Sequence, residues 1–270
     1  MKNIRLGNYL LENYFFDSEE KVKKYLLTGW VKVNGETVRD YQRFVTGQEK
    51  IIVGNPKGRF VSRGGDKLQH ALDVFKVSLT PKIAADLGAS TGGFTDCLLK
   101  AGAEKVYAID LSYGQFAYSL RNNKRIVLKE RTNVKDLKKD DFWEKIDFIT
   151  VDLSFISILH IFSKIKDIFT PAEGIILLKP QFEAKSNEHE NGVVKNKENH
   201  RKILQRVIYG LIQKGLFFKD LTFSPLKGPA GNIEFLLYFS LFENTREVDL
   251  GIVDRLIEKV VREGYEYLIN

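Results

Sequence analysis

The sequence predicts an α/β protein in which a doubly wound, Rossmann-like sheet follows a small α+β domain. From residue 83 onward, short apolar runs alternate with segments whose apolar residues recur at helical spacing. This alternation is typical of a parallel sheet with helices on both faces. One run, Ile83-Ala84-Ala85, enters a glycine-rich segment at 86–94, after which Leu98 and Leu99 continue at helical spacing. A strand therefore passes through a tight turn into a helix.

Residues 1–56 are expected to form the small domain. Two short amphipathic helices come first, because apolar residues recur at helical spacing in two places: Leu6, Leu10 and Leu11, and then Val22, Tyr25 and Leu26. Asp17 or Ser18 would cap the second helix and Gly29 would end it. A hairpin turn at Asn34-Gly35 and a closing strand at 51–53 complete the domain.

A linker at 57–62 leads into the larger domain, residues 63–270. Its first helix carries Leu68, Ala71, Leu72 and Phe75 on one side. Strands are expected near 83–88, 105–110, 126–129, 147–152, 174–179, 217–224 and 233–241, with helices near 93–101, 115–121, 157–168 and 197–214. A final helix near 250–263 would cover a flank. Residues 183–195 are polar and aperiodic, which indicates a mobile loop.

Charge and composition favour an intracellular protein with a polyanionic partner. The chain has 270 residues and a net charge of +7, and residues 1–59 hold eleven Lys and Arg against seven Asp and Glu. Nucleic acid would suit such a surface, although solvated lysines in a small domain would look the same. Cys97 is the single cysteine, so no internal disulfide can form. Because no signal segment or run of about 20 apolar residues is visible, we expect a cytoplasmic protein without membrane association.

The glycine-rich turn predicts a site for a nucleoside-containing cofactor. Such a turn presents backbone N–H groups at a helix N-terminus. Asp110 ends the next apolar run, where a carboxylate can accept hydrogen bonds from ribose hydroxyls. The spacing Gly88-xxx-Gly92-Gly93 is not that of a dinucleotide site, and it suits S-adenosylmethionine, which has no pyrophosphate. A tight turn without a ligand is the alternative. The candidate cofactor residues are Asp86, Gly88, Ala89, Ser90, Thr91, Gly92, Gly93, Phe94, Asp110, Asn133 and Asp152.

Three charged residues are expected at the same edge of the sheet as this turn. Asp152 and Lys179 each end a predicted strand, and Glu234 begins one that would reach this edge if it is antiparallel. An unpaired ammonium behind an apolar strand is costly to bury, so Lys179 needs a partner. Any one of the three alone could be a surface charge at a strand end. Convergence of all three would instead indicate a reactive site.

The N-terminal stretch resembles the small RNA-binding domain first recognised in ribosomal protein S-four and in pseudouridine synthases. The residues that match are Arg5-Leu6, Leu10, Ser18, Val22, Leu26, Gly29, Val31, Val33-Asn34-Gly35, Val38, Val45 and Gly47. Gly7 departs from that pattern, where the family usually has Asp, and Glu19 stands where a basic residue often follows the serine. Candidate RNA-phosphate contacts are Arg5, Lys21, Lys24, Lys32, Arg59, Arg63 and Lys227.

Residues 60–241 resemble the FtsJ-like ribose 2′-O-methyltransferases, whose Lys-Asp-Lys-Glu tetrad matches Lys67, Asp152, Lys179 and Glu234. Five segments together resemble the TlyA family: Ser62-Arg63-Gly64-Gly65, the stretch 89–96, the stretch 151–157, Lys179-Pro180-Gln181-Phe182-Glu183 and Gly231-Asn232-Ile233-Glu234-Phe235. The resemblance implies a class I methyltransferase fold, S-adenosylmethionine as cofactor, and methylation of cytidine ribose in ribosomal RNA. Some members of that family also carry a haemolysin label.

Three functions from different classes therefore stand at this stage. The favoured one is an rRNA ribose methyltransferase that acts on ribosomal subunits, as a monomer, with the tetrad as its catalytic residues. The others are an RNA-binding protein without catalysis and a membrane-active haemolysin. Lys179 would contact the ribose hydroxyl, either as a neutral base or as a charged group that stabilises the developing alkoxide. No metal is expected, because His70, His160, His189 and His200 show no ligand spacing; His160 is interpreted as structural and His189 as solvated.

Overall fold

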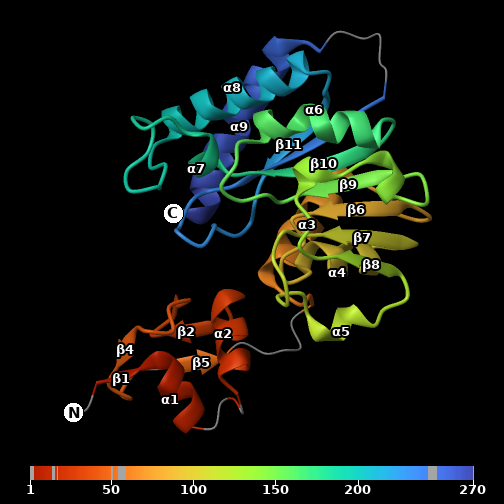
Figure 1. The fold of residues 1–270 in the computed structure, drawn as a ribbon. Helices are drawn as coiled ribbons and strands as arrows, with labels where there is room; N and C mark the ends of the chain where they lie inside the picture. The colour runs from red at the N-terminus through yellow and green to blue at the C-terminus, as the bar shows by residue number, and fades with distance from the viewer. Residues whose placement is uncertain are drawn as a thin grey trace. The chain divides into compact units, whose positions relative to one another are not determined.

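The computed structural model describes residues 3–13, 16, 18–49, 51–53, 59–242 and 248–269. The chain divides into two compact units, Met1–Arg63 and Gly64–Asn270 (Figure 1). The first two residues of the predicted linker, 57 and 58, lie outside the described residues, as does Asp17, one of the two candidate helix caps. The domain boundaries that we inferred from the sequence remain a prediction.

The first unit is small and mixes helices with short strands. Its elements are β1 (Ile4–Arg5), α1 (Leu6–Glu12), α2 (Glu19–Leu27), β2 (Val31–Val33), β3 (Glu36–Thr37), β4 (Phe44–Val45) and β5 (Ile51–Val53). Strand β2 pairs antiparallel with β3 and β5, while β1 pairs with β4. Its buried core consists of Leu6, Leu10, Val22, Leu26, Val31, Val33, Val38 and Val45. The amphipathic spacing seen in the sequence therefore identified the packed faces of both helices.

Two local features of this unit follow from side-chain chemistry. Ser18 caps α2, because its side chain accepts a hydrogen bond from the Lys21 N–H group at 3.4 Å. At Gly7, a Cβ atom would lie only 2.1 Å from the Tyr41 ring. The glycine that departs from the family pattern is thus matched to an aromatic ring packed against its backbone.

The second unit contains a seven-stranded sheet with the strand order β11-β12-β10-β9-β6-β7-β8. Its strands are β6 (Ile83–Leu87), β7 (Lys105–Ile109), β8 (Ile126–Lys129), β9 (Phe148–Val151), β10 (Glu173–Leu178), β11 (Phe217–Phe223) and β12 (Phe235–Ser240). Neighbouring strands from β10 to β8 pair in parallel, and β12 pairs antiparallel with β10 and β11. The predicted α/β class with a doubly wound sheet is confirmed, and so is the antiparallel direction of the last strand.

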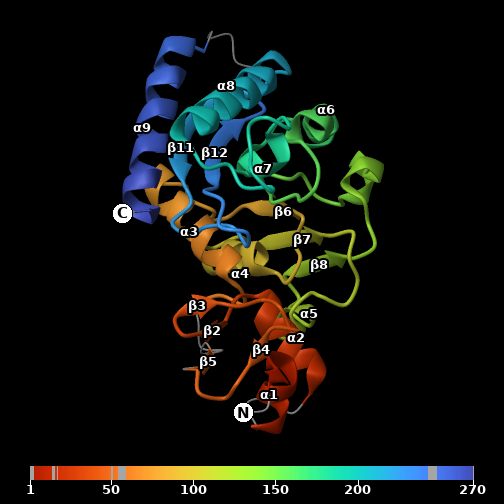
Figure 2. The ribbon, with the colours of Figure 1, turned by 90° about the vertical axis from the view of Figure 1, so that its left-hand side faces the viewer.

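Helices surround this sheet. They are α3 (Arg63–Phe75), α4 (Gly93–Lys100), α5 (Tyr118–Arg121), α6 (Ile158–Phe169), α7 (Pro180–Glu183), α8 (Lys197–Gln213) and α9 (Leu250–Leu268), with short 3-10 turns η1 (Val134–Asp136) and η2 (Lys139–Asp141). Ala85 and Leu87 of β6 share a core with α6, α8 and α9. The residue between them, Asp86, faces α4 instead, because side chains alternate across a strand. Figure 2 shows α9 alongside α8 and β11, so the last helix covers a flank as expected.

Three segments differ from the sequence-based expectation. The helix expected at 115–121 begins only at Tyr118, because Ala117 has a non-helical ψ of 128° and donates its N–H to Thr91 O of the glycine-rich turn at 3.1 Å. Helix α7 was not foreseen, since one turn is too short to show periodicity. The segment at 183–195 was expected to be a mobile loop, but ion pairs and hydrogen bonds hold it, including Glu188 to Arg206 at 2.7 Å.

Candidate active site

The site lies at the carboxyl edge of the parallel strands, on both sides of β6. Strand β6 pairs with β7 on one side and with β9 on the other, so the chain reverses its winding direction here. In doubly wound sheets ligands bind at such a switch point. Leu178, at the end of β10, is paired with Phe235, at the start of β12. The antiparallel register therefore brings Lys179 and Glu234, the next residue outward on each strand, to the same edge.

Two ion pairs hold the four predicted catalytic residues together. Lys67 Nζ on α3 lies 2.5 Å from Glu234 Oε2, and Lys179 Nζ lies 2.5 Å from Asp152 Oδ1. The Glu234 side chain is only 1% exposed and that of Lys67 is 11% exposed. Buried charges of this kind are tolerated only when they are paired. The structure thus brings together Lys67, Asp152, Lys179 and Glu234 from four separate parts of the chain.

The turn before β12 is shaped around the Glu234 carboxylate. A Cβ atom at Gly228 would lie 2.4 Å from Glu234 Oε1, so a larger residue there would displace the carboxylate. Gln181 Nε2 donates to the same oxygen at 3.5 Å. Asn232, which is buried, accepts from Val194 N and donates to Gly192 O, both at 2.9 Å. The side chain of Asn232 thereby ties the polar loop to the strand that carries Glu234.

Lys179 is held in its charged form. Burial lowers the pKa of Lys179, but the carboxylates of Asp152 and Glu234 together outweigh that effect and raise the pKa above its ordinary value. Lys179 Nζ also donates to Ser154 Oγ at 3.0 Å. Of the two states that the sequence left open, this direction favours the ammonium form of Lys179.

A cavity of about 730 Å³ opens beside this cluster. Five predicted cofactor residues line it: Gly88, Ser90, Asp110, Asn133 and Asp152. The other six candidates, Asp86, Ala89, Thr91, Gly92, Gly93 and Phe94, are not part of its wall. Its apolar lining comes from Leu111, Val134, Leu153, Phe155, Ile156 and Ile161. The cavity therefore joins acidic and backbone groups to an apolar wall on which a flat ring could lie.

The glycine-rich turn is held by contacts that only glycine permits. Gly88 has φ +91°, and a Cβ atom there would lie 2.4 Å from the Asp152 carbonyl oxygen. The N–H groups of Gly88 and Ala89 both donate to Ile109 O, at 2.9 and 3.0 Å. The turn is thus packed between the ends of β7 and β9, which fixes its backbone beside the cavity.

Asp110 anchors the cavity wall at the end of β7. Its carboxylate accepts hydrogen bonds from Ser90 N and Ser112 N, each at 2.7 Å. Ser112 Oγ also donates to this carboxylate, so about one of its roughly four acceptor positions remains for a ribose hydroxyl. The polar atoms and the apolar wall fit a nucleoside with an attached amino acid. The residues present thus fit S-adenosylmethionine.

Asp86 lies beneath the turn rather than on the cavity wall. Its side chain is fully buried, and its two oxygens accept hydrogen bonds from Thr95 Oγ1 at 2.6 Å and Thr150 Oγ1 at 2.8 Å. Burial raises the pKa of Asp86 to about 7, although both threonine hydroxyls oppose the shift. These contacts indicate that Asp86 orients the turn from below, although the sequence placed it among the candidate cofactor residues.

Two residues of this region were missed or misread in the sequence. His160 was interpreted as a structural residue of an apolar helix, but it is exposed and lines the cavity. Phe155 is 90% exposed with φ +64°, and its ring centroid lies 5.1 Å from that of Phe182. Helical spacing in the sequence does not show whether His160 is buried or faces a cavity. Phe155 lies outside any periodic segment, so the sequence gives no signal for its position.

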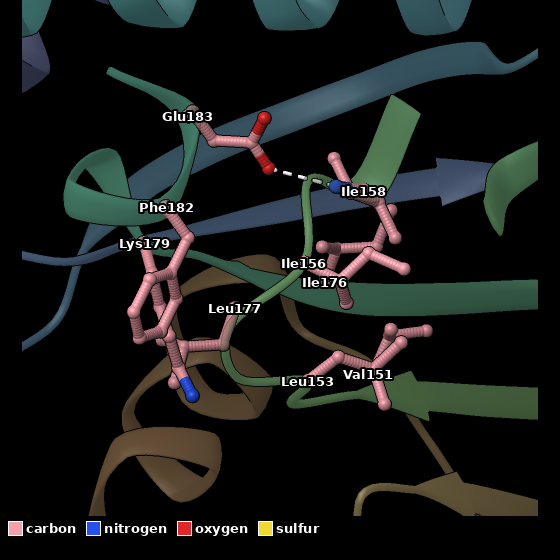
Figure 3. Close-up of a pocket in the computed structure, with 9 residues that line it drawn as sticks. All are labelled: Val151, Leu153, Ile156, Ile158, Ile176, Leu177, Lys179, Phe182 and Glu183. Atoms are coloured by element: carbon pink, nitrogen blue, oxygen red, sulfur yellow. Dashed lines mark hydrogen bonds between the residues drawn. The ribbon is translucent and has the colours of Figure 1, made fainter. Parts of the chain in front are cut away.

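A second, much smaller cavity of about 10 Å³ is lined in part by Lys179 (Figure 3). Leu153 and Ile156 border both cavities, and Lys179, Phe182 and Glu183 close the small one from the side of α7. In Figure 3, Glu183 reaches across to the backbone nitrogen of Ile158. This space holds no more than a water molecule, so the side chains between the end of β9 and α7 are closely packed.

The candidate RNA contacts are divided between the two units. Arg5, Lys21, Lys24, Lys32, Arg59 and Arg63 belong to the first unit, and Lys227 precedes the Gly228 turn of the second. Arg5, Lys21, Lys32 and Arg59 are exposed, whereas Lys24, Arg63 and Lys227 are partly buried. Their role in RNA binding remains a prediction.

The described residues contain neither a metal-ligand cluster nor a membrane-spanning helix. Within the described ranges, no three or more His, Cys, Asp or Glu side chains gather as a metal site. No helix in the described part of the chain combines the length and apolarity that would let it cross a bilayer.

Comparison with known proteins gives a consistent group of relatives. Residues 60–241 match the family model of the FtsJ-like methyltransferases. The chain is 39% identical over 271 residues to a candidate rRNA methyltransferase, YqxC, of Bacillus subtilis. The matched region covers 99% of this chain and 96% of that protein. It is 34% identical over 266 residues to the 16S/23S rRNA (cytidine-2′-O)-methyltransferase TlyA of Mycobacterium tuberculosis, with coverage of 97% and 99%. A solved structure of a candidate hemolysin from Streptococcus thermophilus superposes with a TM-score of 0.77 at 33% identity, covering 99% of this chain and 97% of that one.

Proposed function

The chain belongs to the FtsJ-like methyltransferase family, within its TlyA group, and we propose that it methylates a ribose 2′-hydroxyl, that of a cytidine, in ribosomal RNA. The observation that carries this proposal is that two ion pairs, Lys67 with Glu234 and Lys179 with Asp152, lie beside the cavity that Asp110 lines. S-adenosylmethionine would supply an electrophilic methyl group there. Ribosomal subunits in the cytoplasm are the proposed partners, and the proposed enzyme acts as a monomer.

The charged state of Lys179 defines its part in the reaction. A ribose hydroxyl is a weak nucleophile, so it must be held in line with the methyl group and relieved of its proton. The ammonium of Lys179 can donate to the 2′-oxygen and stabilise the negative charge that develops on it. Asp152, 2.5 Å from that ammonium, can take a lysine proton as the hydroxyl proton reaches Lys179. The 2′-oxygen, held and relieved of its proton in this way, would accept the methyl group that S-adenosylmethionine supplies.

Glu234 acts on the charge of Lys179, and Lys67 acts on Glu234. Glu234 is one of the two carboxylates that raise the pKa of Lys179, so it keeps the ammonium charged despite burial. Lys67 neutralises Glu234 in turn. The network therefore balances two cations against two carboxylates, which lets a proton shift within it without leaving an isolated buried charge.

Phe155 is proposed to contact the target base. Its ring is exposed at the edge of the cavity, one residue from Ser154, which accepts a hydrogen bond from Lys179. A base taken out of its stack is stabilised by an aromatic surface, with a contribution of about 1–3 kcal/mol per stacked base. Stacking on Phe155 would place the attached ribose near Lys179.

Transfer of labelled methyl groups from S-adenosylmethionine to unmodified ribosomal subunits tests the proposal. The wild type should label RNA at a site that resists alkaline cleavage, because a methylated 2′-oxygen cannot attack the adjacent phosphate. Lys179→Ala should reduce the rate at least 100-fold, while S-adenosylmethionine binding persists. Cofactor binding without label on either subunit would favour the RNA-binding alternative, and leakage of lipid vesicles would favour the haemolysin alternative.

A further inference from the structure

The segment at 152–157 contains Asp152, Ser154 and Phe155, and it lacks regular secondary structure. One end is fixed by the sheet, since Asp152 N donates to Leu87 O at 2.9 Å. Phe155, in the middle, adopts φ +64°, which a phenylalanine does not hold unless its surroundings enforce it. The segment therefore needs a second fixed point on the far side of Phe155.

Glu183 provides contacts at that second point. Its Oε1 accepts from Ile158 N at 2.8 Å, and Ser157 Oγ donates to its Oε2 at 2.5 Å. These donors begin α6, where the first N–H groups have no partner within the helix and the helix dipole favours an acceptor. Ser157 is itself the cap of α6, and its Oγ accepts from Leu159 N at 3.3 Å. Glu183 thus binds both the cap residue and the first residue of α6.

The same glutamate is coupled to Lys179 through α7. This single turn starts directly after Lys179, and Phe182 N donates to Lys179 O at 2.9 Å. Arg206 on α8 holds the other end, because its Nη2 donates to Glu183 O at 2.9 Å. Two sets of polar contacts then join the segments that follow β9 and β10. Lys179 contacts Asp152 and Ser154, and Glu183 contacts Ser157 and Ile158. The nearly filled apolar space of Figure 3 lies between them.

We propose that Glu183 is a positioning residue for methyl transfer, which fixes the segment at 152–157 against α7 and so sets the geometry of Asp152, Ser154 and Phe155 around Lys179. The effect of Glu183 on catalysis rests on the proposed function. The mechanical link, by which Glu183 joins α7 to the segment at 152–157, does not depend on that function. Burial raises the pKa of Glu183 despite its hydrogen bonds from Ser157 and Ile158. A neutral glutamine at this position is therefore a close mimic, since it can accept from Ile158 N and donate to Ser157 Oγ.

Hydrogen exchange of the peptide that spans 152–160 tests the mechanical link without any activity. Glu183→Ala removes the acceptor of Ile158 N–H, and exchange in this peptide should accelerate at least tenfold. Glu183→Gln should stay within about threefold of the wild type. Glu188→Ala is the matched control, because Glu188 pairs with the same Arg206, whereas Glu183 is the acceptor for Ser157 and Ile158. Unchanged exchange in Glu183→Ala, or equal acceleration in Glu188→Ala, would overturn the link.

Methyl-transfer kinetics test the consequence for the reaction. Glu183→Ala should lower kcat at least tenfold with a smaller change in KM for RNA, and Glu183→Gln should restore kcat to within threefold of the wild type. If Glu183→Ala does not fold, Ser157→Ala removes one of the two contacts and should show the same pattern at smaller size. Faster exchange with unchanged kcat, or a glutamine variant as slow as the alanine variant, would refute positioning. A wild type that transfers no methyl group would refute the proposed function, while the exchange result would still decide the link.

Discussion

The buried pair of Lys67 and Glu234 gives the sharpest test of how the site is held. Glu234→Gln leaves the Lys67 ammonium without its partner, and Lys67→Met leaves the Glu234 carboxylate without its own. The two atoms lie 2.5 Å apart with side chains 11% and 1% exposed. Removing one member of such a buried pair costs about 3–5 kcal/mol. In a unit of this size, about 2–4 °C is lost per kcal/mol, so the melting temperature should fall by roughly 10 °C.

The double variant Lys67→Met/Glu234→Gln separates stability from function. With both charges replaced by groups of similar shape, the unfolding free energy should return to within about 1 kcal/mol of the wild type. Methyl transfer should stay low, because the Lys179 ammonium has lost one of the two carboxylates that raise its pKa. The measurements are thermal unfolding followed by circular dichroism and the rate of methyl transfer for all four proteins. Single variants that lose less than about 1 kcal/mol, or a double variant as unstable as both singles combined, would refute the reasoning.

Three further predictions concern the cofactor side of the site. The native pKa of Asp86 is about 7, above its ordinary value of 3.8, so its contribution to the free energy of unfolding is full below pH 4 and is lost as the pH rises to 7. Relative to the wild type, Asp86→Asn should therefore gain about 1.4 kcal/mol of unfolding free energy per pH unit across that window. Gly88→Ala should weaken S-adenosylmethionine binding and lower the melting temperature more than Gly114→Ala, which shares a positive φ but has open space at its Cβ position. Asp110→Asn should weaken cofactor binding by about 10–100-fold in calorimetry, because hydrogen bonds to a charged acceptor contribute about 1.5–3 kcal/mol.

Each of these predictions has a contrary result. Parallel pH profiles of the unfolding free energy for the wild type and Asp86→Asn would show that Asp86 has the same pKa in the folded and unfolded states. Equal losses in the two glycine variants would show that backbone strain, and not the Asp152 carbonyl, decides the Gly88 position. Unchanged calorimetric affinity in Asp110→Asn would remove Asp110 from the ribose site.

The sequence by itself determined the fold of the larger unit and most of the charged residues that meet at one edge of its sheet. Apolar runs of strand length, a glycine-rich turn and helical spacing are local signals, so the strands from β6 to β12 could be placed to within one or two residues. Lys179, Asp152 and Glu234 were found because a charge directly beside a buried strand is expensive unless it is paired. Lys67 came from the resemblance alone, since a lysine near a helix start has no such cost.

Only the tertiary structure decided what these residues do to one another. The charge state of Lys179 depends on the balance between its burial and two carboxylates from distant parts of the chain. Asp86 and Asp110 look alike in the sequence, each at a strand end. The alternation of side chains across β6 turns Asp86 toward two threonines, whereas Asp110 lies past the end of β7 on the cavity wall. The positions of Glu183 and His160 depend on how their helices pack in the folded protein. Electrostatic interactions and hydrogen bonds depend on distance in space, which the sequence does not contain.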